Sequence, residues 1–287
     1  MPTYRVFHHS TYRFDNWAIV SNSRARLLPK DTPNQTTRFS QLVVVPPPTV
    51  KEETTDTFGN RVTLFSYRSQ LARLEVTSIS TVDVRPCAYK VNDLSGIPWQ
   101  ACVDAVRSNP TLNEECHAFH VSSALVDIKS TSISDYARAT CIAGQSLLDI
   151  ILDLMSRLKL DMTYVQGVTD VHTTAVEALQ AGKGVCQDFA HIAIGCLRSM
   201  GLAARYVCGY HATVQRRSQY EPHAWASVYI PEHGWLDFDP TNNSFCDERY
   251  ITLAWGRDFM DVSPLQGAVG GDVVHTLEAS VEIEELD

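Results

Sequence analysis

The pattern of apolar and polar residues gives the first part of the chain strand character. Up to about residue 85, short apolar runs alternate with turn residues. Gln41–Val45 ends at a run of prolines, Arg61–Tyr67 follows the turn Asp56–Asn60, and Leu74–Val84 is a further predicted strand. Strands joined by turns are typical of an antiparallel sheet. We therefore expect an antiparallel, β-sandwich-like N-terminal domain.

The second part of the chain places helices before strands. Pro98 can begin a short helix over Trp99–Arg107. From Ser134 to Leu158 the apolar spacing is helical, and the clearest stripe consists of Leu147, Ile150, Ile151, Leu154 and Leu158. A second helical pattern starts at Cys186 and stops at Gly201. This order predicts an α+β fold.

Four strands are predicted towards the end of the chain: Ala203–Tyr210, His223–Ile230, Trp235–Asp239 and Val273–Ile283. The last one alternates, with Leu277, Ala279, Val281 and Ile283 expected to point inward. We expect this C-terminal strand to pair with a sheet, with that of the first domain as the candidate.

Composition removes several classes of function. The 287 residues carry a formal net charge of −9 with no offsetting Lys/Arg cluster, which argues against nucleic acid as a partner. The N-terminus lacks the apolar region of a secretory signal, and the longest apolar stretch, Leu147–Leu154, is interrupted by Asp149 and Asp153. We expect a cytoplasmic protein without membrane attachment. The 8 cysteines form no CxxC pair, so reduced thiols are a better interpretation than disulfides or a zinc site.

One cysteine stands where a glycine-rich turn becomes a helix. In Gly182–Ala190, Cys186 follows Gly184 and Val185, and the apolar spacing downstream is helical. The positive end of a helix and its unpaired N–H groups favour thiolate, the nucleophilic form of cysteine. Taken alone, such a residue is more often a packed thiol than a nucleophile.

Two further residues supply what thiol catalysis needs. His223 opens a predicted strand as a candidate acid and base, and Asp239 ends the neighbouring strand, where its carboxylate can orient the imidazole. The backbone N–H of Cys186 is available to an oxyanion. Asp237 competes with Asp239 because both share a face of the strand, but only Asp239 stands at its end. We take His191 as structural and His233 as an exposed turn residue.

These motifs resemble the bacterial transglutaminase-like superfamily. The similarity rests on Gly184–Ala190, Gly201–Tyr210, His223–Trp225 and Asp239–Thr241, in the family order. Residues 4–84 also resemble the N-terminal β domain that accompanies this core in many bacterial members, and 256–264 resemble a C-terminal signature. We accordingly divide the chain into an N-terminal β domain (1–90), a transglutaminase-like cysteine catalytic core (91–250) and a C-terminal extension (251–287).

The resemblance implies a papain-like core, with a helix-borne cysteine packed on an antiparallel sheet and a Cys–His–Asp triad at Cys186, His223 and Asp239. It also implies acyl transfer through a thioester. In animal transglutaminases an aromatic side-chain N–H helps to hold the oxyanion, but no tryptophan stands at a matching place here. Tyr164 and Gln187 are the alternative donors. No acidic loop suggests calcium, so neither a metal nor another cofactor is expected.

Three functions remain open at the level of sequence. The leading prediction is a cysteine hydrolase, a peptidase or amidase that acts on a peptide or protein substrate. The second is a transglutaminase that crosslinks a glutamine to an amine, and water exclusion would decide between the two. The third is a binding module that has lost its chemistry, against which the intact triad positions argue. The sequence leaves the oligomeric state open.

Overall fold

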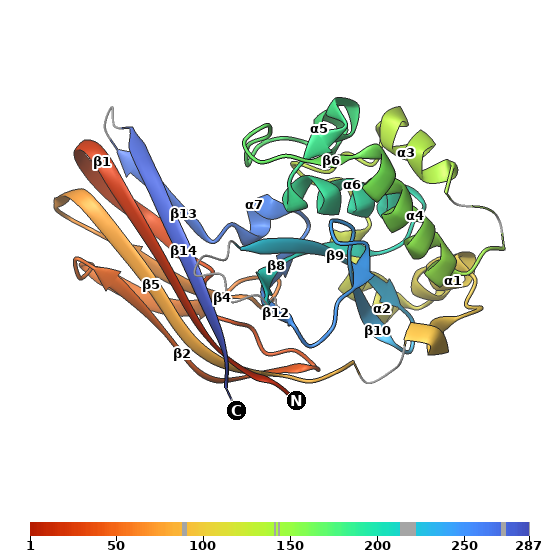
Figure 1. Cartoon of the computed structure of the whole chain (residues 1–287), viewed down its shortest axis with the longest axis horizontal. Helices are drawn as coiled ribbons and strands as arrows, with labels where there is room; N and C mark the ends of the chain where they lie inside the picture. Colours follow the sequence, from red (N-terminus) through yellow and green to blue (C-terminus); the bar gives the residue numbers. More distant parts are fainter. Residues whose placement is uncertain (88–90, 141, 143, 213–221, 271–273, 287) are drawn as a thin grey trace.

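A β-sheet and an α+β core make up the molecule (Figure 1). The computed structural model describes residues 1–87, 91–140, 142, 144–212, 222–270 and 274–286. Cys141 and the first residue of the predicted strand Val273–Ile283 lie outside these ranges. The two termini lie side by side, because Thr3 at the start of β1 pairs with Leu286 at the end of β14. The antiparallel sheets and the mixture of helix and strand confirm the predicted α+β class.

The N-terminal strands form one antiparallel sheet in the order β2-β5-β1-β4-β3, and β13 and β14 also pair with β1. Their bounds are β1 Thr3–Ala25, β2 Gln35–Val45, β3 Val50–Thr55, β4 Arg61–Ser66, β5 Gln70–Val84, β13 Leu265–Gly270 and β14 His275–Leu286. The 23-residue β1 is shared by all parts of the sheet: its first half pairs with β5 and β14, its second half mainly with β4 and β13. The expected sandwich of separate sheets is therefore not confirmed.

The C-terminal strand β14 joins the N-terminal sheet, antiparallel to β1. Its alternation is only partly a core pattern. Val281 is fully buried and Ile283 packs against the main core, whereas Leu277 is 52% exposed. Instead of filling the core, Leu277 and Ala279 line a cavity between β14 and the α+β core. The division of the chain into domains stays a prediction.

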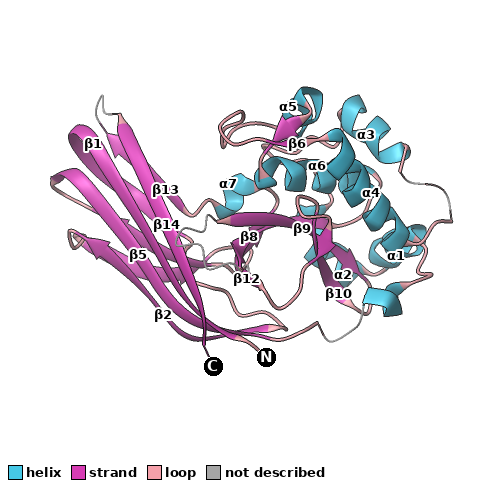
Figure 2. Cartoon of the chain, viewed as in Figure 1, coloured by secondary structure: helices cyan, strands magenta, loops and turns pink. Residues whose placement is uncertain are grey.

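The α+β core is built on a second antiparallel sheet in the order β11-β10-β9-β8-β12 (Figure 2). Its strands are β8 Ala204–His211, β9 His223–Ile230, β10 Gly234–Asp239, β11 Ser244–Phe245 and β12 Tyr250–Gly256. A short parallel pair, β6 Thr163–Tyr164 and β7 Lys183–Gly184, lies outside this sheet. Because β9 lies between β8 and β10, His223 at its start comes close to the end of β10.

The α-helices of the core are α1 Trp99–Ser108, α2 Pro110–Cys116, α3 Thr131–Arg138, α4 Leu147–Asp161, α5 Ala175–Ala181, α6 Cys186–Ser199 and α7 Phe259–Val262. Two 3₁₀ turns, Val91–Leu94 and His117–Phe119, flank α1 and α2. The helical stretch predicted from Ser134 to Leu158 is two helices. Gly144 has a left-handed φ of +81°, and Ser146 caps a new helix by accepting from the N–H of Asp149.

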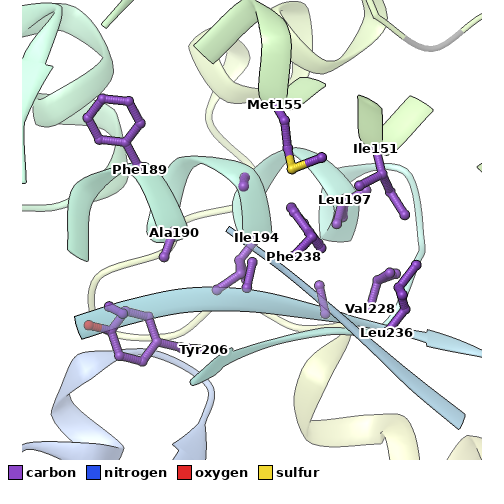
Figure 3. Close-up of a cluster of buried hydrophobic side chains, with 14 of the residues drawn as sticks. Ile151, Met155, Phe189, Ala190, Ile194, Leu197, Tyr206, Val228, Leu236 and Phe238 are labelled. Atoms are coloured by element: carbon purple, nitrogen blue, oxygen red, sulfur yellow. The ribbon is translucent and has the colours of Figure 1, made fainter. Parts of the chain in front are cut away.

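Helix α6 lies between α4 and the second sheet, as Figure 3 shows. Ile194 and Leu197 of α6 are fully buried, with Met155 of α4 on one side and strand residues such as Val228 on the other. A helix that is apolar on nearly every face is typical of a core position. This burial fixes the axis of α6 and with it the position of Cys186.

Buried amides join the two sheets. Gln35 of β2 accepts from the N–H of Thr252 and donates to its carbonyl, both at 2.8 Å. Asn60 forms the same pair of bonds with the backbone of Trp255. Both amide side chains are almost completely buried, so each continues the hydrogen bonding of β12 as a neighbouring strand would. The N-terminal sheet is thereby held against β12 of the core.

Candidate active site

Cys186 is the first residue of α6, as its sequence context predicts, and its side chain is half-buried. Asp188 organises this helix start. Its Oδ2 accepts from the N–H of Val185 and from the hydroxyl of Thr169, both at 2.7 Å. Burial raises the pKa of Asp188 above its ordinary value. A Cβ on Gly184 would overlap the Asp188 carboxylate, which explains the glycine before the helix.

His223 lies at the start of β9, and its Nε2 is 2.6 Å from Oδ2 of Asp239 at the end of β10. Since Nε2 is taken by Asp239, Nδ1 is the ring nitrogen left to face Cys186, which lines the same cavity as His223. Burial lowers the pKa of His223, but the hydrogen bond and charge of Asp239, together with the neighbouring Cys186, outweigh burial and raise it to about 10. The structure thus brings the three predicted residues together.

Asp239 is completely buried and accepts five hydrogen bonds. Oδ1 accepts from the N–H groups of Thr241 and Asn242, and Oδ2 accepts from His223, from the Asn242 amide and from the Tyr250 hydroxyl. Burial alone would raise the pKa of Asp239, but the hydrogen bonds from His223 and Tyr250 outweigh it and hold the pKa below its ordinary value. A carboxylate with this many donors is fixed in orientation.

Sequence reasoning missed Asn242 and Tyr250. The turn after Asp239-Pro240 is a signal that could have pointed to Asn242, because residues of such turns often donate back to the aspartate that opens them. Tyr250 offers no comparable signal, since it reaches Asp239 from the next long strand, β12. His211 is also close, with its ring stacked on Tyr250 at 4.3 Å and its centroid 5.9 Å from that of His223.

The competing residues lie elsewhere. Asp237 lines a different cavity from Cys186 and is not hydrogen-bonded to His223. His191 is completely buried, its Nε2 accepts from the N–H of Phe259, and burial lowers its pKa to about 4. This environment agrees with a structural role. His233 is exposed in the turn between β9 and β10, as predicted.

A cavity of about 980 Å³ opens over Cys186 and His223 between the N-terminal sheet and the α+β core. We call it the thiol cavity. The α+β core contributes Tyr164, Gln187 and Cys208 to its wall, and β14 contributes Leu277–Ser280. Both predicted oxyanion donors therefore border the thiol, although the Gln187 amide also donates to the Val171 carbonyl at 3.4 Å. The cavity is of a size that accommodates a peptide segment or a small molecule.

The rest of the described chain adds two observations. No three His, Cys, Asp or Glu side chains within the described ranges are grouped so as to hold a metal ion. In the same ranges, no helix combines the length and apolar character that a membrane crossing requires.

Comparison with known proteins defines the class of this fold and site. The model of the transglutaminase-like superfamily matches residues 134–240, and that of the bacterial transglutaminase-like N-terminal region matches residues 4–83. An uncharacterized protein of Mycobacterium tuberculosis (strain ATCC 25618 / H37Rv) is 34% identical over 282 residues, covering 93% of this chain and 87% of the relative. The chain belongs to the transglutaminase-like superfamily and carries its bacterial N-terminal region.

Two further similarities bear on fold and chemistry. A crystal structure from Cytophaga hutchinsonii, described as that of a "putative cysteine protease", has a TM-score of 0.78 at 21% identity and covers 100% of this chain and 91% of that one. This likeness shows the fold. A protein-glutamine gamma-glutamyltransferase of Pseudomonas aeruginosa is 27% identical over 126 residues, which are 39% of this chain and 18% of that protein.

Proposed function

We propose that this protein is a cysteine hydrolase that cleaves a peptide or amide bond through a thioester on Cys186. The observation that carries the proposal is that Cys186 and His223 line the thiol cavity together, while His223 is hydrogen-bonded to the buried Asp239 behind it. Nucleophilic catalysis needs a thiol, a group that moves its proton and a third group that orients the second. We assign Cys186, His223 and Asp239 to these three roles.

The proposed reaction starts with attack by the Cys186 sulfur on the substrate carbonyl carbon. The imidazolium of His223 and the N-terminus of α6 stabilise the negative charge that the sulfur carries into this step. The oxyanion of the tetrahedral intermediate lies near the Cys186 N–H, with Tyr164 and Gln187 as the candidate side-chain donors. His223 then gives its proton to the departing amine, the carbon–nitrogen bond breaks and the thioester remains.

Water resolves the thioester in the second half of the proposed reaction. His223, now neutral, takes a proton from the attacking water, and the oxygen bonds to the acyl carbon while the carbon–sulfur bond breaks. The carboxylic acid leaves, and Cys186 and His223 return to their starting state. Asp239 holds the imidazole in one orientation throughout, because its five hydrogen bonds leave it no freedom to turn.

The second candidate is transfer of the acyl group to a primary amine, which would crosslink a glutamine to an amine. It is favoured by the similarity to the Pseudomonas aeruginosa protein-glutamine gamma-glutamyltransferase, which covers 39% of this chain. Both reactions share the thioester and differ in what attacks it. A binding module without chemistry is disfavoured by the intact hydrogen bonding of Asp239. The predicted cytoplasmic location and the predicted absence of nucleic-acid and membrane partners stay predictions.

A peptide library with and without an added primary amine tests the proposal. We expect purified protein to release new amino termini, and the amine to enter no product. Amine incorporation in place of hydrolysis would identify the transferase. Absence of both reactions, with a thiol that reacts no faster than the other cysteines, would support the binding module.

A further inference from the structure

A second cavity, separate from the thiol cavity, combines the size and the lining residues of a small-molecule binding site. Its volume is about 560 Å³, and it shares no lining residue with the thiol cavity. It lies where the β2 end of the N-terminal sheet meets β10 and β12, and Trp235, Trp255 and Tyr250 form its aromatic wall. We call it the tryptophan cavity. Its volume falls within the range that small-molecule sites occupy.

Arg205 brings a buried positive charge to this cavity. The side chain is only 6% exposed, and its guanidinium lies 4.1 Å from the ring centre of Trp235 and 3.8 Å from that of Trp255. Both rings pack against the guanidinium, so its terminal N–H groups are the polar part that is left for a ligand. Among the described residues, Arg205 forms no ion pair and its buried Nε has no hydrogen-bond partner.

Asp237 brings a negative charge to the same cavity. Its Oδ1 is buried and has no hydrogen-bond partner in the part of the chain that the structure describes. The charge of Asp237 acts on Arg205, but the two side chains form no ion pair. Leaving a buried donor and a buried acceptor without hydrogen bonds destabilises the folded protein. Such groups in a cavity are therefore typical of a ligand-binding site whose ligand supplies the missing hydrogen bonds.

The other charged groups of the tryptophan cavity are already occupied. Arg85 donates to the Pro33 carbonyl and the Thr36 hydroxyl, at 3.4 and 3.2 Å. Asp247 accepts two hydrogen bonds at 2.9 Å from Nε of Arg249. Arg85 keeps its charge, but Arg205 and Asp237 are the cation and the anion of this cavity whose side chains have no hydrogen-bond partner among the described residues. A purely anionic or purely cationic molecule would satisfy one of these two and be repelled by the other.

We propose that the tryptophan cavity binds a small zwitterion, a free amino acid or a dipeptide, with its carboxylate on Arg205 and its ammonium group on Asp237. The aromatic wall then contacts the ligand's side chain. The site is independent of the proposed hydrolase activity. It is nevertheless close to the triad, because the Tyr250 ring lines the cavity while the Tyr250 hydroxyl donates to Asp239 at 2.9 Å.

Calorimetric titration of the full chain carrying Cys186→Ala tests this proposal, because this variant cannot turn the probe over. The alanine variant is preferable to alkylation, since the exposed Cys87 lines the tryptophan cavity and would be alkylated as well. The probes are alanine, leucine, phenylalanine and dialanine, each compared with its N-acetyl and its amide derivative. We expect at least one unmodified probe to bind, and either derivative to bind about tenfold more weakly or worse, because each lacks one charge-assisted bond. The preference between the single amino acids and dialanine identifies the ligand.

Asp237→Asn and Asp247→Asn form a matched pair of variants in one cavity. The first removes the unpaired charge and is expected to weaken the unmodified probe about tenfold or more. The N-acetyl derivative, which carries only a carboxylate, is expected to bind this variant at least as tightly as the parent, because repulsion by Asp237 is removed. The second removes a carboxylate that is already bound to Arg249 and is expected to change affinity less than about threefold. Three results would overturn the proposal: no probe binds, Asp237→Asn binds the unmodified probe as tightly as the parent, or both derivatives bind as well as the zwitterion.

Discussion

Asp237 and Asp239 lie two residues apart on β10, and each faces one of two very different surroundings. Asp239 is completely buried beside the thiol cavity and accepts five hydrogen bonds. Asp237 lines the tryptophan cavity, and its buried Oδ1 accepts none from the described residues. Two aspartates on the same strand therefore differ in how many further hydrogen bonds they can accept, and this difference comes entirely from their neighbours.

The difference separates two kinds of polar site. Around Asp239 every donor is already in place, so the carboxylate can only hold His223 and cannot recruit a ligand. Around Asp237 the protein leaves hydrogen-bonding capacity unused, which a bound molecule can satisfy. The first arrangement suits chemistry that needs a fixed imidazole, and the second suits recognition.

The largest expected effect is that of Cys186→Ala, which should abolish turnover and remove the fastest reaction with iodoacetamide at neutral pH. Cys208→Ala is the matched control. Cys208 lines the same cavity, but it is fully buried and burial raises its pKa to about 12. Hydrolysis assays and mass spectrometry of the labelled protein provide the measurements. Turnover that survives in the alanine variant at 186 would show that the nucleophile is a different group.

Asp239→Asn and Asp237→Asn compare the two carboxylates directly. Loss of the charge that orients His223 should lower turnover by a factor on the order of 10² to 10⁴, the scale known for the third member of a triad. Asp237→Asn should lower turnover less than about threefold, because Asp237 is not hydrogen-bonded to His223. Steady-state hydrolysis of one peptide substrate gives both values, and equal losses would contradict the assignment of Asp239.

The sequence predicts the local parts of the triad well. Cys186 begins a helix with a regular apolar stripe, and β9 His223–Ile230 has the predicted bounds. Both signals are short-range, since they follow from apolar spacing and from turn residues nearby. The same is true of Asp239, which Pro240 sets at the end of a strand.

What the sequence does not predict depends on pairing between distant segments. The Tyr250 hydroxyl reaches Asp239 only because β12 pairs with β8, and no local pattern encodes that contact. The strand β1 shows the same dependence: Asp15 and Asn16 are typical turn residues, yet the strand continues through them to pair with β4 and β13. The single N-terminal sheet follows from this long strand.

Acid should destabilise the protein through His8, a buried histidine that has neutral partners in place of a carboxylate. Its Nδ1 is 2.7 Å from the Tyr210 hydroxyl, and burial lowers its pKa from 6.5 to about 4. Between these two pKa values, His8 is therefore protonated in the unfolded chain and neutral in the folded chain. Stability is complete above about pH 6.5 and falls as the pH drops towards 4, by about 3 kcal/mol from this group.

His8→Gln isolates this contribution. The variant should be less stable than the parent at pH 7, because it loses a buried hydrogen bond, but the difference should shrink on acidification. Urea unfolding at pH 7 and near pH 4.5 measures it. A difference between His8→Gln and the parent that does not vary with pH would be inconsistent with the lowered pKa of His8.

His223, whose pKa is raised by Asp239, should show the opposite trend. Its contribution to stability is present below about pH 6.5 and is lost as the pH rises through about 10.

Tyr250→Phe has the smallest expected effect and bears on both cavities at once. It removes one of five hydrogen bonds to Asp239 and leaves the aromatic wall of the tryptophan cavity intact. Turnover should fall about tenfold or less, because the four remaining hydrogen bonds still hold the carboxylate, so that only part of the energy of the lost bond reaches the imidazole. Binding in the tryptophan cavity should be unchanged. If the variant instead lost zwitterion binding and kept full turnover, Tyr250 would serve recognition, and the fixed orientation of Asp239 would rest on Asn242 and the backbone of the following turn.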